Sequence, residues 1–276
     1  MTFAKSPFFK RSVTTVIGLP LVLLFVWLGG FPLLVACALI AILALREFYL
    51  AFSKKDRPIH FIGYLATIGY FGALFFLGAG YFFIALALFI ITVQICLVTF
   101  FKNLPISECI PIVYGVLYVP FLFSFILLVR EHPLGDYYIW LIFISSFGCD
   151  TFAYLTGSLF GKNKLKNTPS PSKSYEGLAG GIIGATAIGI IYGVIVSRLT
   201  TDYSIAESIA LISALISFFG AIFSIIGDLA ASAVKRRCQV KDFGKIFPGH
   251  GGFMDRIDSL LTVAPVVYIV MVVMLA

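Results

Sequence analysis

The chain has 276 residues, of which 60% are hydrophobic and only 12% are charged, and its mean hydropathy is +1.04. This composition excludes a water-soluble globular domain and predicts an integral membrane protein built from helices. The formal net charge of +7 indicates basic cytoplasmic loops and an anionic substrate, and nucleic acid is not an expected partner.

The predicted membrane spans are apolar runs separated by glycine, proline and clusters of charge. Each run reaches or approaches the roughly 20 residues that a helix needs to cross the bilayer. We therefore expect an all-α polytopic fold of about nine transmembrane helices. They cover approximately residues 13–29, 32–52, 59–78, 80–101, 109–129, 137–157, 177–197, 206–234 and 259–275.

The distribution of basic residues predicts the orientation of these spans. With a cytoplasmic N-terminus and an outside C-terminus, all 20 lysines and arginines except Arg130 and Arg198 lie on the cytoplasmic side. Lys5, Lys10 and Arg11 resemble the start of a signal peptide. The apolar run after them is too long for one, so we expect a retained first span.

Residues 1–135 are predicted to form a scaffold of transmembrane helices. Their spans contain almost no polar side chains, which is typical of helices that face lipid and one another. Arg46 and Glu47 are expected to pair with each other near a cytoplasmic helix end. The five cysteines lack CxxC spacing, and we expect them to be buried small hydrophobic residues.

Residues 136–276 are predicted to carry the chemistry, beginning with Asp150 in the sixth span. A carboxylate within an apolar helix is costly and therefore indicates function, although a structural ion pair is the alternative. The loop 161–176 contains four lysines and ends with Lys173 and Ser174 ahead of a helix. Such a loop is typical of a phosphate-binding site, and the alternative is an ordinary basic cytoplasmic loop.

The next two spans carry patterns with helical spacing. In the seventh span, small residues recur every fourth position from Gly177 to Gly193, which favours close helix packing and allows a homodimer without requiring one. In the eighth span, Asp228, Ser232 and Lys235 lie on one face. An acid, a hydroxyl and an ammonium on one stripe suit a metal and a phosphate together, although they could also be a salt bridge at a helix end.

The stretch from Ser232 to Asp258 concentrates six basic residues and three carboxylates. His250 precedes a Gly-Gly turn, and Asp255 and Asp258 project to the same side of the ninth span. Hard oxygen ligands beside phosphate-binding cations point to one or two Mg²⁺ ions, held by Asp255 together with Asp228.

This stretch resembles the signature of the phosphatidate cytidylyltransferase (CDP-diacylglycerol synthase) family. The shared block, at 232–258, is S-x-V-K-R-x4-K-D-x-G-x2-F-P-G-H-G-G-x2-D-R-x-D. Shorter pieces also resemble the family: C-D-T-x-A-Y-x2-G from 149, S-P-x-K-S-x-E-G from 170 and G-D-L from 227. The family more often has Lys-Lys-Thr-Trp where this chain has Ser-Lys-Ser-Tyr at 172–175, and residues 1–130 match only in hydropathy.

The resemblance implies transfer of the cytidylyl group of CTP to phosphatidate, giving CDP-diacylglycerol and diphosphate for phospholipid biosynthesis. It implies Mg²⁺-assisted in-line attack on the α-phosphorus. Asp228, Lys235, Asp255 and Asp258 are the expected catalytic residues, with Asp228, Asp255 and Asp150 at the metal. The expected substrate-binding residues are Lys173, Ser174, Ser232, Arg236, Lys241, His250 and Arg256.

We expect such an enzyme in a bacterial inner or plasma membrane, with its active site facing the cytoplasm where CTP is found. Two other functions would also use acidic spans or CTP. An ion-coupled transporter would use Asp150 and Asp228 as its carriers, but the first half lacks matching acidic spans. A CTP-dependent lipid or polyprenol kinase would differ in the phosphorus attacked. CDP-alcohol phosphotransferases are excluded because their D-G-x2-A-R motif is missing.

Overall fold

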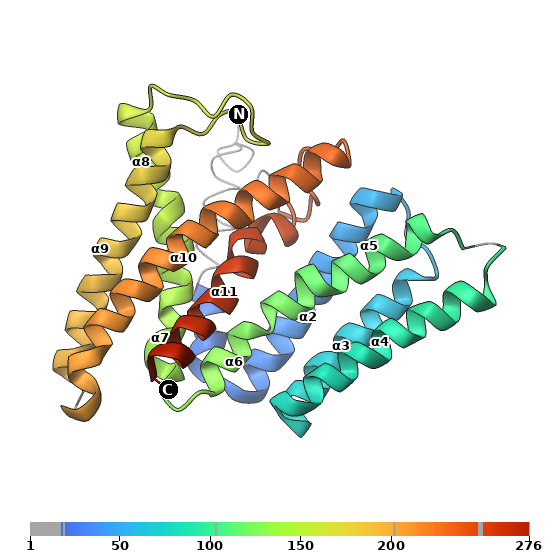
Figure 1. Ribbon diagram of the computed structural model, residues 1–276, viewed down its shortest axis with the longest axis horizontal. Coiled ribbons are helices and arrows are strands. Elements are labelled where there is room, and N and C mark those ends of the chain that lie inside the picture. Colours follow the sequence, from blue (N-terminus) through green and yellow to red (C-terminus); the bar gives the residue numbers. More distant parts are fainter. Residues whose placement is uncertain (1–17, 19, 103, 201–202, 248–250, 276) are drawn as a thin grey trace, which may run out of the picture. The chain divides into compact units, whose positions relative to one another are not determined.

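A computed structural model describes residue 18 and residues 20–102, 104–200, 203–247 and 251–275 (Figure 1). Within these ranges the chain forms helices and connecting loops, and strand-like pairing is limited to two isolated bridges. This confirms the all-α class. Residues 20–28 are helical, and the elements that follow are α2 (Gly30–Ser53), α3 (His60–Leu77), α4 (Ala79–Thr99), α5 (Ile106–Val116), the π-helix η2 (Leu117–Phe121), α6 (Phe125–Glu131), α7 (Gly135–Phe143), the π-helix η3 (Ile144–Gly148), α8 (Cys149–Phe160), α9 (Tyr175–Leu199), α10 (Tyr203–Arg237) and α11 (Met254–Leu275).

Seven helices in the described part of the chain are long and apolar enough to cross a membrane. An eighth apolar segment, Phe83–Thr99, is shorter. These segments correspond to the predicted spans from the second onward. Of the first predicted span, residues 13–17 and 19 lie outside the described residues, and residues 20–28 are helical. The number nine and the orientation of the termini stay predictions. The seven spans are Gly30–Ser53, His60–Leu77, Ile106–Glu131, Gly135–Phe160, Tyr175–Leu199, Ser208–Arg237 and Met254–Leu275.

The chain folds into two compact units, each of which takes a second segment from near the C-terminus. The first unit contains Met1–Ser124 and Cys238–Ile257, and the second contains Phe125–Arg237 and Asp258–Ala276. These units describe packing. The predicted division into a scaffold (1–135) and a catalytic half (136–276) is a division by role, and it stays a prediction.

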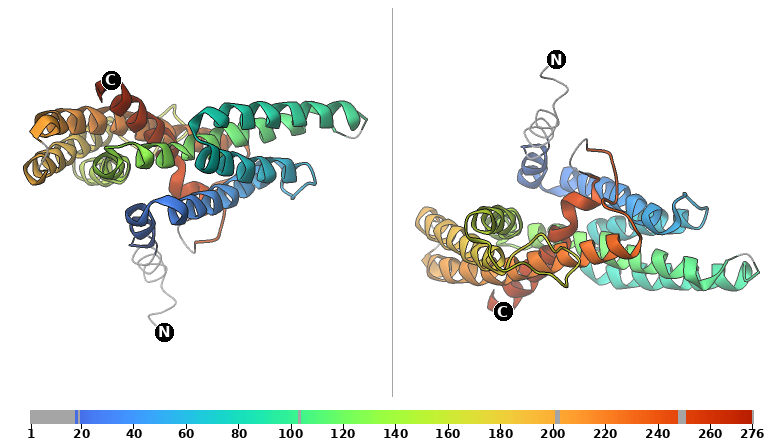
Figure 2. Two further views of the ribbon diagram at one scale, coloured as in Figure 1. Left: turned by 90° about the horizontal axis from the view of Figure 1, so that it is seen from below. Right: turned by 90° about the horizontal axis from the view of Figure 1, so that it is seen from above.

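In the first unit, α2 packs against α3 and α5, and Tyr49 lies at their meeting point. The Tyr49 hydroxyl donates a hydrogen bond to the carbonyl of Ile112 at 3.1 Å. A side chain at Gly63 of α3 or at Gly115 of α5 would collide with the Tyr49 ring, so glycine at both positions lets the helices close on it. The neighbouring α3 and α4 run side by side, as the blue-green pair in Figure 2 shows.

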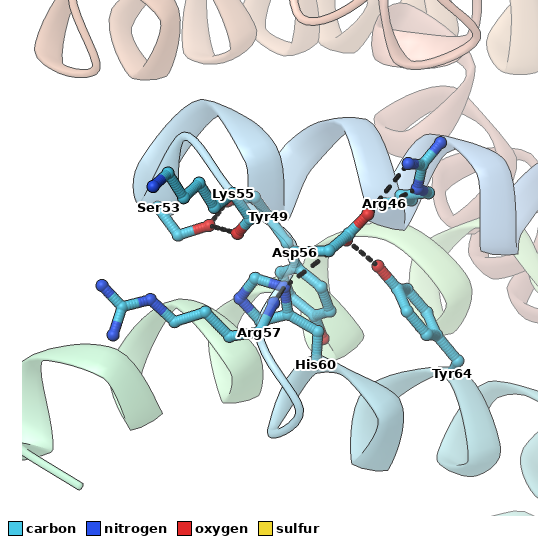
Figure 3. A network of polar contacts seen from close by, with 8 residues as sticks. All are labelled: Arg46, Tyr49, Ser53, Lys55, Asp56, Arg57, His60 and Tyr64. Carbon is cyan, nitrogen blue, oxygen red and sulfur yellow. Dashed lines mark hydrogen bonds and ion pairs between the residues drawn. The ribbon is translucent and has the colours of Figure 1, made fainter. Parts of the chain in front are cut away.

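The connection between α2 and α3 is organised by Asp56. Its Oδ2 atom accepts hydrogen bonds from Arg46 Nε at 3.0 Å and Nη2 at 2.8 Å, and its Oδ1 atom accepts one from the Tyr64 hydroxyl at 3.2 Å (Figure 3). Partial burial opposes ionisation of Asp56, but Arg46 outweighs it and lowers the pKa of this carboxyl. The expected pairing of Arg46 with Glu47 is therefore wrong, because Asp56 takes the guanidinium.

In the second unit, α9 packs against both α8 and α10, which Figure 1 draws in gold, yellow-green and orange. The predicted small-residue ridge makes both contacts. A side chain at Gly181 would come within 2.9 Å of the Cys149 carbonyl of α8, and one at Gly189 would collide with Ser217 of α10. These helices therefore approach closely because both positions lack a side chain.

Candidate functional site

The loop between α8 and α9 is held in a defined shape by its own backbone. Leu165 N–H donates to the Lys173 carbonyl and Tyr175 N–H donates to the Asn163 carbonyl, both at 3.0 Å. Ser174 is the N-cap of α9, and its Oγ atom accepts a hydrogen bond from Gly177 N–H at 3.2 Å. Capping satisfies a backbone donor that the helix leaves free. Lys173 is thus presented from an ordered turn at the start of α9.

Lys173 forms an ion pair with Asp228 of α10, a residue 55 positions further along the chain. Both side chains are about three-quarters buried, with 26% of each exposed. A partly buried ion pair of this kind loses less strength to solvent than a surface pair does. The pair joins the predicted phosphate-binding loop to the predicted acidic stripe.

Residues 258–275 of α11 bring a further carboxylate to α10. A side chain at Gly227 would meet Thr262 and would come within 2.9 Å of the Asp258 carbonyl, so glycine there permits close contact. Thr262 donates a hydrogen bond to the Phe223 carbonyl of α10 at 2.7 Å. Asp258 is buried, with 8% exposed. This places Asp258 beside the end of α10 that carries Asp228.

Asp258 interacts electrostatically with three charged residues of the same unit: Asp228, Lys235 and Asp150. Together with Lys173, they make up what we call the polar cluster. Its two ammonium groups and three carboxylates sum to a formal charge of −1, from +2 and −3. In a chain with 12% charged residues, five charges in one place are unusual. Such groups are retained in a membrane protein when they are paired or serve a function.

The donor set of the polar cluster fits a hard divalent cation. Its three aspartates offer only carboxylate oxygens, which Mg²⁺ prefers, and its charge before any ligand binds is negative. Within the described ranges, no three Asp, Glu, His or Cys side chains already converge closely enough to form a metal centre by themselves. A cation here would therefore share its coordination with oxygens supplied by a phosphate ligand.

Asp255 lies in the first unit, where its carboxylate binds backbone N–H groups of the loop before α11. Its Oδ2 atom accepts hydrogen bonds from the N–H groups of Phe243 at 2.9 Å, Gly252 at 3.0 Å and Gly244 at 3.4 Å. Gly251, with φ of +79°, packs directly against this carboxylate. Asp255 thus shapes the loop that precedes α11, and its predicted role as a metal ligand stays a prediction.

The remaining predicted substrate-binding residues lie in varied surroundings. Arg236 is exposed and donates from Nε to the Pro169 carbonyl at 3.5 Å, which brings the basic end of α10 to the loop 161–174. Ser174 is buried and occupied as a helix cap, and Ser232 is half-buried. Lys241 and Arg256 are exposed side chains of the first unit, and His250 lies outside the described residues.

Two structural features near the polar cluster were missed from the sequence. The π-helix η3 ends immediately before Cys149 and Asp150, and π-turns commonly occur at functional sites. Ser146 in η3 shares a hydrogen bond with Ser259 at 2.7 Å, next to Asp258. The sequence of the π-turn contains no proline or other residue that would predict it. The hydrogen bond between Ser146 and Ser259 could not be predicted either, because 113 residues separate them.

The chain was compared with known proteins. Residues 9–274 match the model of the cytidylyltransferase family. A phosphatidate cytidylyltransferase of Thermotoga maritima is 40% identical over 156 residues, which is 56% of each chain. Those of Bacillus subtilis and Staphylococcus saprophyticus are 34% and 29% identical, over 70% and 98% of their own lengths. The match to the family model extends into the N-terminal half, where the sequence alone offered only hydropathy.

Proposed function

The chain belongs to the cytidylyltransferase family, and from that premise we propose that it makes CDP-diacylglycerol from CTP and phosphatidate. As a nucleotidyltransferase, it would move the cytidylyl group of CTP onto the lipid phosphate and release diphosphate. The names of its relatives support this substrate pair. The apolar helices suit a lipid substrate, and the net charge of +7 suits two anionic ones.

The observation that carries the proposal is the ion pair between Lys173 and Asp228, which joins the basic loop to the polar cluster. Lys173 and Lys235 would hold phosphate oxygens, since an ammonium group binds phosphate as a compact charge. Asp228, Asp258 and Asp150 would hold Mg²⁺, which when bound neutralises charge on the phosphates of CTP. The sequence also assigns Asp255 to the metal, and that assignment remains part of the proposal.

The proposed reaction needs no general base from the protein. An oxygen of the phosphatidate phosphate is already ionised near neutral pH and can attack the α-phosphorus of CTP. A new P–O bond forms there, the bond between the α-phosphorus and its bridging oxygen breaks in line, and diphosphate leaves with that electron pair. The contribution of the protein is then to position the two phosphates and to reduce the repulsion between them.

The remaining basic residues would extend the binding surface for phosphates. Arg236 lies beside the loop 161–174, while Lys241 and Arg256 are exposed. Ser174, Ser232 and His250 remain part of the proposal as substrate-binding residues. The positive-inside rule predicts that these basic residues face the cytoplasm, where CTP is available. The proposed topology has nine spans in a bacterial inner membrane, with the C-terminus on the outer side.

The test is an assay of purified protein in detergent with CTP, phosphatidate and Mg²⁺. We expect CDP-diacylglycerol and diphosphate in equal amounts, and loss of both in Asp228→Asn, because an amide cannot replace the carboxylate in neutralising a cation. Wild-type protein that is folded but forms no CDP-lipid would contradict the proposal.

A further inference from the structure

A buried carboxylate, Glu47, lies in α2, in the half of the chain that was expected to be scaffold only. Only 5% of Glu47 is exposed. Its neighbour Arg46 is half-exposed and is bound to Asp56, as Figure 3 shows, so the two adjacent side chains serve different partners. Burying a carboxylate is costly unless hydrogen bonds compensate it, and an apolar side chain would fill the same space at lower cost. Glu47 therefore needs an explanation beyond packing.

The partner of Glu47 is the loop that begins after α10 and leads into α11. Glu47 Oε2 accepts a hydrogen bond from the backbone N–H of Met254, the first residue of α11, at 2.9 Å. A side chain at either Gly244 or Gly252 would fall on the Glu47 carboxylate. Two separate positions of the loop therefore lie against one carboxylate, and they can approach it this closely only because both are glycine.

We call the attachment of this loop to Glu47 the clamp. Three further contacts within the first unit complete it. Asp255 Oδ2 binds the N–H groups at 243, 244 and 252. Phe247 N–H donates to the Gly251 carbonyl at 2.9 Å, which closes the loop on itself. The Phe243 ring stacks on Phe48, the neighbour of Glu47, with ring centroids 6.1 Å apart. The loop is thus attached to α2 by a carboxylate and an aromatic side chain at consecutive positions.

We propose that Glu47 is a positioning residue for the proposed cytidylyl transfer, an inference that rests on that function. By binding the N–H of Met254, it determines where α11 begins. The start of α11 carries Asp255 and Arg256, and Asp258 follows one turn later on the same helix. Glu47 contributes through the backbone of the signature segment and makes no direct contact with substrate. The role of α2 is then to hold this segment in register.

The contact with the Met254 N–H requires a side chain at position 47 that is long enough and ends in a hydrogen-bond acceptor. Three variants test these two requirements. Glu47→Gln keeps an acceptor oxygen at the same distance, whereas Glu47→Leu removes it and Glu47→Asp withdraws it by one methylene. We expect kcat to fall about 100-fold in the leucine variant, because small displacements of catalytic groups have effects of that size. The aspartate variant should be similarly impaired, and the glutamine variant should recover most of the activity.

A substitution in the loop tests the same contact from the side of its partner. Gly252→Ala places a methyl group on the Glu47 carboxylate, and we expect a comparable loss of kcat. Gly69→Ala in α3 is the matched control, since open space surrounds Gly69, and it should retain wild-type kcat. Unchanged thermal unfolding of Glu47→Leu, together with its lower kcat, would separate positioning from general stability.

Hydrogen exchange tests the clamp without relying on activity. In Glu47→Leu, the amides of Met254, Phe243, Gly244 and Gly252 should exchange at least tenfold faster, while amides in α9 keep their wild-type rates. If a folded Glu47→Leu keeps both wild-type kcat and wild-type exchange at Met254, the inference is wrong. If wild-type protein makes no CDP-lipid, the proposed function fails, and the exchange experiment still decides whether Glu47 holds the loop.

Discussion

Lys173 is ion-paired with Asp228 in the polar cluster, and in the proposed reaction it would also present an ammonium group to a phosphate. Without it, the cluster would keep Lys235 as its single cation against three carboxylates. Their mutual repulsion would then rise in a partly buried setting, where charges interact more strongly than in water. Ligand phosphates would be repelled for the same reason.

We therefore expect Lys173→Met to lower kcat/KM about 100-fold, the usual effect of removing one electrostatic contact to the transition state. Lys164→Met is a matched control, because Lys164 lies in the same loop and its Nζ atom reaches only the carbonyl of Ser172, at 3.3 Å. Steady-state kinetics with CTP and phosphatidate measure both. Equal activity of the two variants would remove Lys173 from the site.

Residues of the polar cluster can be predicted from the sequence where helical spacing or an unusual charge distinguishes them. Asp228 and Lys235 share a stripe by spacing, and Asp150 is conspicuous within an apolar segment. The role of Glu47 cannot be predicted in this way, because its partner Met254 is 207 residues away. The backbone contacts of Asp255 cannot be predicted either, because the sequence does not distinguish a carboxylate that binds N–H groups from one that binds a metal.

Among the helices, α9 shows how a sequence pattern becomes packing. The periodic small residues predict a smooth ridge, and in the structure that ridge lies against α8 near Gly181 and against α10 near Gly189. The predicted span 177–197 corresponds to the helix Tyr175–Leu199, which begins two residues earlier, ends two residues later and is capped by Ser174. By contrast, the π-helix η3 could not be predicted, because its extra residue per turn is imposed by tertiary contacts rather than by local preference.

We expect Gly184→Ala to destabilise the protein by about 1–3 kcal/mol, the usual cost of inserting atoms into a packed core. The added methyl would overlap the Phe152 ring, and α8 and α9 would have to separate. Thermal unfolding in detergent measures the effect, with Gly69→Ala as the control, whose midpoint should not fall below that of the wild type because alanine there meets no neighbour and favours the helix. An unchanged midpoint for Gly184→Ala would show that this contact is not tight.

For the whole molecule, the proposed orientation places the polar cluster and the loop 161–174 in the cytoplasm. Lys166 lies before α9 and Arg198 lies in its last turn, so the two are expected on opposite sides of the membrane. Three of the five native cysteines, at 37, 109 and 149, are buried, and the more accessible Cys96 and Cys238 can be replaced by serine.

In that background, Lys166→Cys should react with a membrane-impermeant maleimide only from the cytoplasmic side of closed vesicles. Arg198→Cys should react only from the opposite side. The physical reason is the positive-inside rule, which places all but two of the 20 basic residues in the cytoplasm. The reverse labelling pattern would overturn the orientation, and with it the access of CTP to the site.

The central claim is that the protein moves the α-phosphoryl group of CTP, with its cytidine, onto a lipid phosphate. Labelled CTP tests it directly when the purified protein is given phosphatidate and Mg²⁺. With ³²P at the α-position, we expect the label in the lipid extract as CDP-diacylglycerol. With ³²P at the γ-position, we expect it in the aqueous phase as diphosphate. Label from the γ-position in the lipid, with release of CDP, would identify a lipid kinase and contradict the account.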